Sequence, residues 1–172
     1  IPAQFPEWTI DVYHGRPQYL GVRQFVERDR AWRSGTGSGN GAAASVDPRQ
    51  EVLRSLETSG LLGMGGAGGR AYKKWQDVRD ARGREKYVVC NGDESEPGTF
   101  KDRHYLERDP HRFIEGALIA AWAVGIDAIY IYLRDEYHGC RELLTRELQR
   151  LTQGAAFALP TLHLRRGAGA YI

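Results

Sequence analysis

Two neighbouring segments constrain this chain more than any other feature of its sequence. The first, residues 63–69, is Gly-rich, and the second, residues 90–102, is dense in Asn, Asp and Glu. A Gly-rich turn that opens a helix presents backbone N–H groups to an anion. A polar loop directly after a strand lies where ligands bind in open α/β sheets. Together the two segments predict a nucleotide site. The polar loop favours flavin mononucleotide (FMN), with its phosphate on the N–H groups and polar side chains facing its ring.

The Gly-rich segment fits the spacing G-x-G-x-x-G through Gly63, Gly65 and Gly68. The dinucleotide fingerprint needs a strand before this run and an acidic residue about 20 positions later. Here a predicted helix comes before the run, and an apolar strand occupies the later region. The P-loop is excluded as well, because no Lys-Ser or Lys-Thr follows the last Gly. What remains is an anion site where the next helix starts, with Lys73 and Lys74 adding charge, or a loop whose glycines serve close packing alone.

Ligand-binding side chains are predicted in the polar loop. Asn91 and Ser95 offer donors and acceptors to a ribityl chain or a flavin edge. The carboxylates of Asp93 and Glu94 accept from hydroxyl and ring N–H groups. The alternatives are a solvated acidic turn and a hydrolase that uses Asp93 or Glu94. Adjacent residues on an extended loop point apart, which disfavours the hydrolase.

Helix-start and strand patterns alternate along the chain and predict an α/β fold. Asp47-Pro48 and Asp109-Pro110 are typical of helix starts, with Asp as the N-cap and Pro at the first helical position. Alternation implies right-handed crossovers and a mostly parallel sheet with flanking helices. Strands are predicted at 86–90 (short and buried), 127–133 and 161–165, and further helices at 70–79 and 141–151. In the helix after Asp109 and in the helix 141–151, the positions predicted to face inward include Ile114, Leu118, Ala121, Leu144, Leu148 and Leu151.

The chain is predicted to hold one folded domain, residues 47–172, preceded by an irregular N-terminal arm, residues 1–46. The arm contains a short helix near residues 19–29 and a Gly/Ser-rich linker before residue 46. The domain is expected to be truncated at its C-terminal end, because the sequence stops directly after the Gly-rich turn 167–170.

Composition narrows the class of protein. A formal net charge of +2, with basic and acidic residues interspersed, gives no indication of nucleic-acid binding. Cys90 and Cys140 cannot alone form a disulfide framework or a four-thiolate site, and they fit a reducing compartment. The His and Cys residues lack metal-ligand spacing, so no metal is predicted. Gly and Glu interrupt the longest apolar stretch, which predicts no membrane span.

These motifs resemble the flavin-binding subunit of NADH dehydrogenases. That family includes the 51 kDa subunit of respiratory complex I, the diaphorase subunit of NAD-reducing hydrogenases and the beta subunit of NAD-dependent formate dehydrogenases. Residues 60–75 resemble its Gly-rich segment, and residues 86–102 resemble its Asn-x-Asp-Glu-x-Glu-Pro-Gly-Thr-Phe-Lys-Asp segment almost residue for residue. Residues 130–137 and 163–172 resemble later motifs. Within them, the runs at residues 132–137 and 163–166 are most similar to formate dehydrogenase beta subunits.

The resemblance implies a Rossmann-like domain that holds FMN and exchanges hydride between NAD(H) and the flavin. It also implies transfer of electrons to iron–sulfur clusters, with a 4Fe-4S cluster expected only in the family's C-terminal region beyond this chain. Glu94 is the implied catalytic residue. Together with the loop analysis, the resemblance assigns cofactor binding to Gly63, Gly65, Gly66, Gly68, Lys74, Asn91, Asp93, Glu94, Ser95 and Tyr171.

The resemblance further implies partners and a location. These are a thioredoxin-like 2Fe-2S subunit and a catalytic formate or hydrogenase subunit, in the cytoplasm. The chain departs from the family at Gly69 and Asp77, where aromatic residues usually flank the nicotinamide nucleotide. FMN binding is therefore implied more directly than NAD binding. The alternative is a truncated, non-catalytic paralogue or scaffold that binds neither flavin nor NAD.

Overall fold

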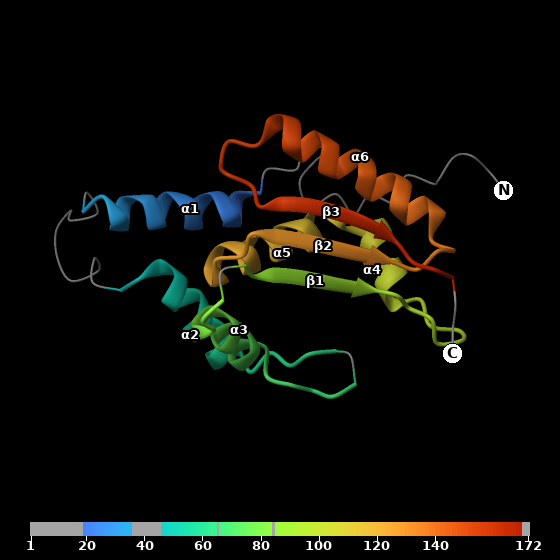
Figure 1. Cartoon of the computed structure of the whole chain (residues 1–172), viewed down its shortest axis with the longest axis horizontal. Helices are drawn as coiled ribbons and strands as arrows, with labels where there is room; N and C mark the ends of the chain where they lie inside the picture. The colour runs from blue at the N-terminus through green and yellow to red at the C-terminus, as the bar shows by residue number, and fades with distance from the viewer. Residues whose placement is uncertain (1–18, 36–45, 65, 84, 170–172) are drawn as a thin grey trace.

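A computed structural model of the chain describes residues 19–35, 46–64, 66–83 and 85–169 and shows the predicted α/β fold (Figure 1). Gly65, Tyr171, most of the predicted linker and the first 18 residues of the arm lie outside the described residues. The elements follow in the order α1 (Leu20–Arg33), α2 (Pro48–Ser59), α3 (Ala71–Asp80), β1 (Tyr87–Gly92), α4 (Lys101–Arg108), α5 (Pro110–Val124), β2 (Ala128–Leu133), α6 (His138–Gly154) and β3 (Thr161–Arg166).

The described strands form a parallel sheet in the order β1-β2-β3, which confirms the predicted parallel arrangement. Val89 of β1 pairs with Tyr130 of β2, which pairs with His163 of β3. Because the strands are parallel, their carboxyl ends all lie at one end of the sheet, on the right in Figure 1. The loops that follow the three strands therefore start next to one another.

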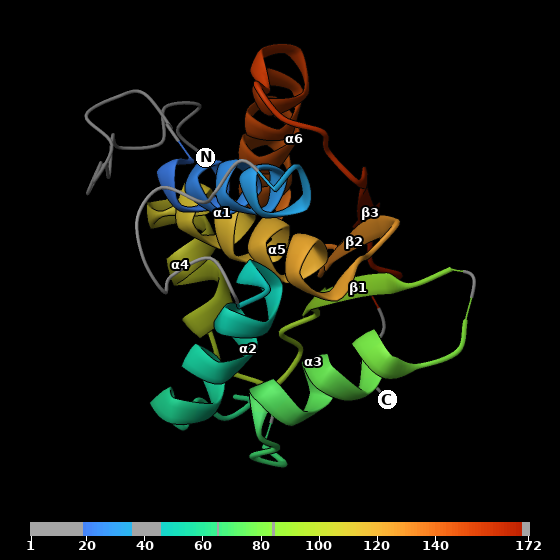
Figure 2. The same cartoon turned by 90° about the vertical axis from the view of Figure 1, so that its left-hand side faces the viewer.

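One face of β2 forms the centre of the core. Ile129, Ile131 and Leu133 are fully buried on this face. Figure 2 shows α1, α4 and α5 on the same side of the sheet. The helix residues of this core include six positions that the sequence predicted to face inward: Ile114, Leu118, Ala121, Leu144, Leu148 and Leu151. Those predictions are confirmed.

The opposite face of the sheet is covered by no helix within the described part of the chain (Figure 2). It carries Tyr87, which is 48% exposed, and Val89, which is 67% exposed. The prediction of a buried strand here was wrong, because β1 lies at the edge of the sheet and only alternate residues face the core. Tyr130 stacks on His163 on this open face, with 4.4 Å between the ring centroids.

Asp residues cap two helices as predicted. The Asp47 side chain accepts a hydrogen bond from the N–H of Arg49 at 2.9 Å, at the start of α2. The Asp109 side chain accepts one from the N–H of Arg112 at 3.1 Å, at the start of α5. Gly60 ends α2 with a φ of 65°, a conformation that glycine adopts without strain.

Helix α1 confirms the helix predicted near residues 19–29, and it packs into the core. Tyr19 and Val22 belong to the buried cluster, and Phe25 stacks on Trp122 of α5 with 5.4 Å between ring centroids. This helix lies on the N-terminal side of the predicted domain boundary at residue 46. The boundary itself stays a prediction.

We expect Leu144→Ala to lower the free energy of unfolding by about 2–5 kcal/mol, because the fully buried side chain leaves a cavity behind. Urea denaturation followed by circular dichroism measures the change. Leu20→Ala is the matched control, since Leu20 is 50% exposed and its truncation should cost only about 0.5 kcal/mol. Equal losses in the two variants would contradict the assignment of Leu144 to the core.

Candidate functional site

The Gly-rich segment forms an exposed loop between α2 and α3 that is closed at its base. Leu62 and Arg70 pair as an isolated antiparallel bridge, and the N–H of Gly63 donates to the carbonyl of Gly69 at 2.7 Å. The described residues from 61 to 70 are all exposed. The backbone of the loop is therefore held at its ends and accessible along its length.

Gly66 and Gly68 give this loop its open backbone. Their φ angles are 97° and 62°, in the region that favours glycine. No atom lies within 4 Å of the place where a Cβ would stand on either residue. A ligand could approach the main chain here without displacing a side chain. Gly65, the residue between Met64 and Gly66, is outside the described part of the chain.

The start of α3 contributes less to an anion site than the sequence predicted. The N–H of Ala71 donates to the carbonyl of Leu61 at 3.0 Å, so one of the free N–H groups of the first helical turn is already used. Lys73 forms an ion pair with Asp77. Lys74 is exposed, and its ammonium group has no hydrogen bond or ion pair among the described residues. Lys74 thus remains available to a ligand.

Three polar residues are linked by hydrogen bonds at the carboxyl end of β1. The N–H of Asp93 donates to Asn91 Oδ1 at 3.0 Å, and the hydroxyl of Ser95 donates to Asp93 Oδ1 at 3.0 Å. Asn91 and Asp93 are exposed. In the described part of the chain the amide NH2 of Asn91 makes no hydrogen bond. These side chains form a compact polar turn that offers both donors and acceptors.

Glu94, in the same loop, points the other way and is 4% exposed. Its Oε1 accepts from the N–H of Asp102 at 2.9 Å. Its Oε2 accepts from the N–H of Arg103 at 3.2 Å and from the hydroxyl of Tyr137 at 2.8 Å. The carboxylate therefore caps the start of α4. Because Asp93 is exposed while Glu94 is buried, the two do not form the carboxylate pair that a hydrolase would use.

The environment of Glu94 keeps it ionised. Burial by itself raises the pKa of Glu94, but the hydrogen bonds from α4 and Tyr137, together with the charge of Lys101, lower it further than burial raises it. The pKa of Glu94 therefore lies below its ordinary value. Burial, and then the hydrogen bond to Glu94, raise the pKa of Tyr137 to about 12, so this hydroxyl stays a donor.

Helix α4 was not predicted from the sequence, because the polar loop was expected to run to about residue 102. The residue before the helix, Phe100, makes no side-chain cap. The cap comes instead from Glu94, which lies well before the helix in the sequence. A search for capping residues directly next to a helix could not have found it.

Arg134 and Gly92 hold the polar loop against the sheet, and neither is among the site residues predicted from the sequence. Arg134 Nη1 donates to the carbonyl of Glu94 at 2.6 Å. A Cβ on Gly92 would stand 2.9 Å from Leu133 Cδ2 and 2.9 Å from the carbonyl oxygen of Tyr132. The signal that could have found Arg134 is its place directly after the strand 128–133, at the same end of the sheet as the polar loop.

The two loops extend in the same direction. Figure 1 shows the Gly-rich loop below β1 and the polar loop beyond it, both toward the carboxyl ends of the strands. Among the described residues no hydrogen bond or ion pair joins the two loops. The structure thus groups Gly63, Gly66, Gly68 and Lys74 in one place, and Asn91, Asp93, Glu94 and Ser95 in another. The predicted ligand Tyr171 lies outside the described residues.

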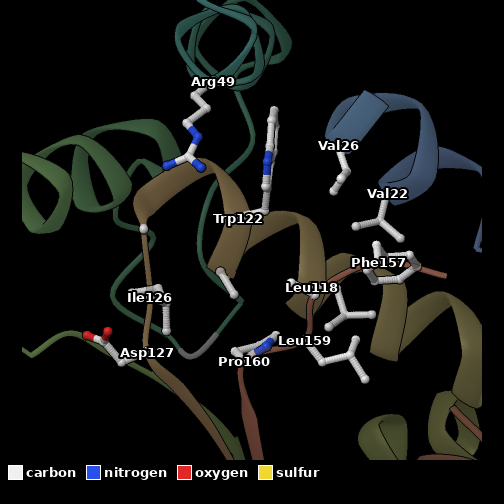
Figure 3. A pocket seen from close by; sticks show the side chains of 13 residues that line it. Val22, Val26, Arg49, Leu118, Trp122, Ile126, Asp127, Phe157, Leu159 and Pro160 are labelled. Carbon is white, nitrogen blue, oxygen red and sulfur yellow. The ribbon is translucent and has the colours of Figure 1, made fainter. Parts of the chain in front are cut away.

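The structure also has a cavity away from these loops, with a volume of about 350 Å³. Its apolar lining includes Val22, Trp122 and Phe157, with the guanidinium of Arg49 5.3 Å from the centroid of the Trp122 ring (Figure 3). Pro160, directly before β3, also lines it, so the cavity lies at the amino ends of the strands. It is therefore at the opposite end of the sheet from the predicted site.

Two other kinds of site, a cysteine nucleophile and a metal centre, have little support in the described part of residues 19–169. Burial raises the pKa of Cys90 to about 11, which makes its thiol a poor nucleophile at neutral pH. No group of three or more His, Cys, Asp or Glu that could hold a metal ion comes together there. None of the helices in those same residues has the length and apolar character needed to cross a membrane.

A family model described as the Nuo51 FMN-binding domain matches residues 56–172. The chain belongs to this family. The resemblance predicted from the two loops is confirmed, and the matched range contains both of them. The family description supports FMN as the cofactor for which this α/β domain is built.

Two curated relatives illustrate the family. One is a subunit of the NADH-quinone oxidoreductase of Rhizobium meliloti (strain 1021). It is 40% identical over 130 residues, which cover 71% of this chain and 31% of the relative. The other is the alpha subunit of the NAD-reducing hydrogenase HoxS of Cupriavidus necator. It is 42% identical over 132 residues, which cover 72% of this chain and 22% of the relative. The matched part is thus a third or less of each relative's length.

A solved structure shows the same fold. The crystal structure of an NAD+-reducing nickel–iron hydrogenase in the H2-reduced state matches with a TM-score of 0.66 and 39% sequence identity. The match covers 72% of this chain and 22% of that chain. The comparisons of sequence and of structure therefore agree on the fold and the family.

We expect Gly92→Ala to lower the free energy of unfolding by about 1–3 kcal/mol, because the new methyl group has no room against β2. Gly116→Ala is the matched control. Gly116 lies exposed within α5 with nothing within 4 Å of its Cβ position, so alanine should stabilise the helix by about 0.5–1 kcal/mol. Thermal unfolding of both variants measures the contrast, and a neutral Gly92→Ala would refute the close approach.

Proposed function

We propose that this chain binds FMN at the carboxyl end of its sheet, as the electron-transfer domain of an NAD-linked oxidoreductase. The observation that carries the proposal is the exposed polar turn of Asn91 and Asp93, held at the end of β1 by the buried Glu94. Membership of a family of FMN-binding domains supports it.

The described residues fit the chemistry of this cofactor. A phosphate needs backbone N–H groups and a cation, and the loop offers open main chain at Gly66 and Gly68 with an available ammonium at Lys74. A ribityl chain and a flavin edge need mixed donors and acceptors, which Asn91 and Asp93 supply. We assign the phosphate to Gly63, Gly65, Gly66, Gly68 and Lys74, and the rest of the cofactor to Asn91, Asp93, Ser95 and Tyr171. The family resemblance alone supports the assignment of Gly65, of Tyr171 and of Gly63, whose N–H already donates to the carbonyl of Gly69.

FMN, when bound, supplies the hydride and single-electron chemistry that amino-acid side chains lack. The chain's own residues would bind and orient it. Asn91 can donate through its amide, and Asp93 can accept through the carboxylate oxygen that Ser95 does not occupy. Glu94 already accepts three hydrogen bonds from protein groups, so we propose that it fixes the loop. Its direct action in catalysis stays a prediction.

For the whole protein we propose an NAD(H)-linked oxidoreductase that works in the cytoplasm with iron–sulfur subunits. The names of the relatives, which are subunits of an NADH-quinone oxidoreductase and of an NAD-reducing hydrogenase, support this reaction class. Within the class we propose a formate dehydrogenase beta subunit, on the resemblance of residues 132–137 and 163–166. NAD binding is proposed with it, and so are a thioredoxin-like 2Fe-2S partner and a catalytic formate or hydrogenase partner.

We expect Lys74→Ala to weaken FMN binding about tenfold, because the phosphate loses a charged hydrogen-bond donor. Quenching of flavin fluorescence in a titration of the chain measures the affinity. Lys73→Ala removes the same charge one residue earlier, from a side chain that already pairs with Asp77. Equal weakening in both variants would indicate general charge attraction and contradict the assigned role of Lys74.

We also expect Asn91→Asp to weaken FMN binding about tenfold while leaving the fold intact. The new carboxylate still accepts from the N–H of Asp93, so the turn is kept, but the amide donor is lost. Thermal unfolding checks the fold, and the same quenching titration measures the affinity. Unchanged affinity in a folded variant would rule out Asn91 as a ligand. Absence of saturable quenching with the unsubstituted, folded chain would favour a non-catalytic paralogue.

A further inference from the structure

Tyr137 lies behind the proposed FMN site and bonds to one of its loop residues. It belongs to the turn after β2, and its hydroxyl donates to Glu94 Oε2 at 2.8 Å, in a bond buried from solvent. The same carboxylate accepts from the N–H groups of Asp102 and Arg103 at the start of α4. One side chain therefore joins three segments: the loop after β1, the start of α4 and the turn after β2.

Arg134 makes a second connection between the same turn and the same loop. Its Nη1 donates to the carbonyl of Glu94 at 2.6 Å, while Nε and Nη2 bind the carboxylate of Glu136 at 2.9 and 3.0 Å. The guanidinium groups of Arg134 and Arg103 lie over the Tyr137 ring, at 5.9 and 5.8 Å from its centroid. The ring of Tyr137 is thus held in place by two cations as well as by its own hydrogen bond.

We propose that Tyr137 is a positioning residue of the FMN site, a role that rests on the proposed function. Through Glu94 it holds the segment that carries Asn91 and Asp93 against the end of the sheet. Both side chains are exposed, and the hydrogen bond between the two residues runs from the backbone N–H of Asp93 to Asn91 Oδ1. Without the buried anchor at Glu94 the turn would be free to move, and the ligand would have to order it on binding.

Charged residues lie in each of the three segments that meet at Glu94. They are Asp93 and Glu96 in its own loop, Lys101, Asp102 and Arg103 in α4, and Arg134 after β2. Lys101 Nζ is 3.8 Å from Glu94 Oε1 and 2.8 Å from Asp102. The positive charge of Lys101 favours the ionised form of the Glu94 carboxylate.

The hydrogen bonds that anchor the loop at Glu94 are lost when the pH falls far enough to protonate its carboxylate. The pKa of Glu94 is lower in the folded chain than its ordinary value of 4.5, so the anchor is complete above that value and is lost as the pH falls through the lowered pKa. The hydrogen bond from Tyr137 is one cause of the lowering. In Tyr137→Phe the pKa of Glu94 should therefore rise, and the anchor should fail at a higher pH.

The experiment compares the unsubstituted chain with Tyr137→Phe and with Tyr105→Phe. Tyr105 is 68% exposed, so its variant loses a hydroxyl away from Glu94. Amide hydrogen exchange of residues 91–103 is measured without FMN. Quenching of flavin fluorescence then measures the affinity for FMN and the pH at which half of the bound FMN is released. We expect Tyr137→Phe to exchange faster over this segment, to bind FMN about tenfold more weakly and to release it at a higher pH. Tyr105→Phe should match the unsubstituted chain.

Unchanged exchange in Tyr137→Phe would overturn the proposal, whether or not FMN binds. Faster exchange with unchanged affinity and unchanged release pH would overturn it too, because the anchor would then not serve the ligand. A folded, unsubstituted chain that binds no FMN would refute the proposed function and this role with it, and the exchange data would show whether the anchor itself exists. If Tyr137→Phe does not fold, Arg134→Lys takes its place, since it weakens the hold on the Glu94 carbonyl and predicts the same changes.

Discussion

Burial of one face of β2 is the interaction on which the rest of this structure depends. Ile129, Ile131 and Leu133 fill the space between the sheet and the helices α5 and α6. Because the strands are parallel and paired in register with β2, this packing also fixes where β1 and β3 end. This core therefore positions the polar loop. The exposed ligand candidates of the loop, Asn91 and Asp93, do not belong to the core.

Glu94 is where that core and the candidate site are connected. Its carboxylate satisfies two N–H groups at the start of α4, so a residue of the ligand loop also supports a helix that packs against α5 and α6. Stability and ligand geometry are coupled through one side chain. A substitution that frees Glu94 to act on a ligand would therefore also remove a helix cap.

Local signals in the sequence predicted the features that depend on local interactions. The Asp caps at Asp47 and Asp109 and the positions of the three strands were all available from patterns of a few residues. The edge position of β1 was not, because a short apolar run fits a central strand and an edge strand equally well. The sequence located the polar loop but could not tell that Asp93 faces solvent while Glu94 faces the core. The inward orientation of Glu94 goes with hydrogen bonds from the start of α4 and from Tyr137, which is distant in sequence.

The bridge between Leu62 and Arg70 affects how the Gly-rich loop can change between relatives. Backbone pairing closes the base of the loop, so α2 and α3 keep their places whatever lies between the two bridge residues. Lengthening a closed loop costs little entropy, about 0.6 kcal/mol for each doubling. Insertions and deletions at the tip are therefore tolerated thermodynamically, and the length of the loop can change without a change in the core.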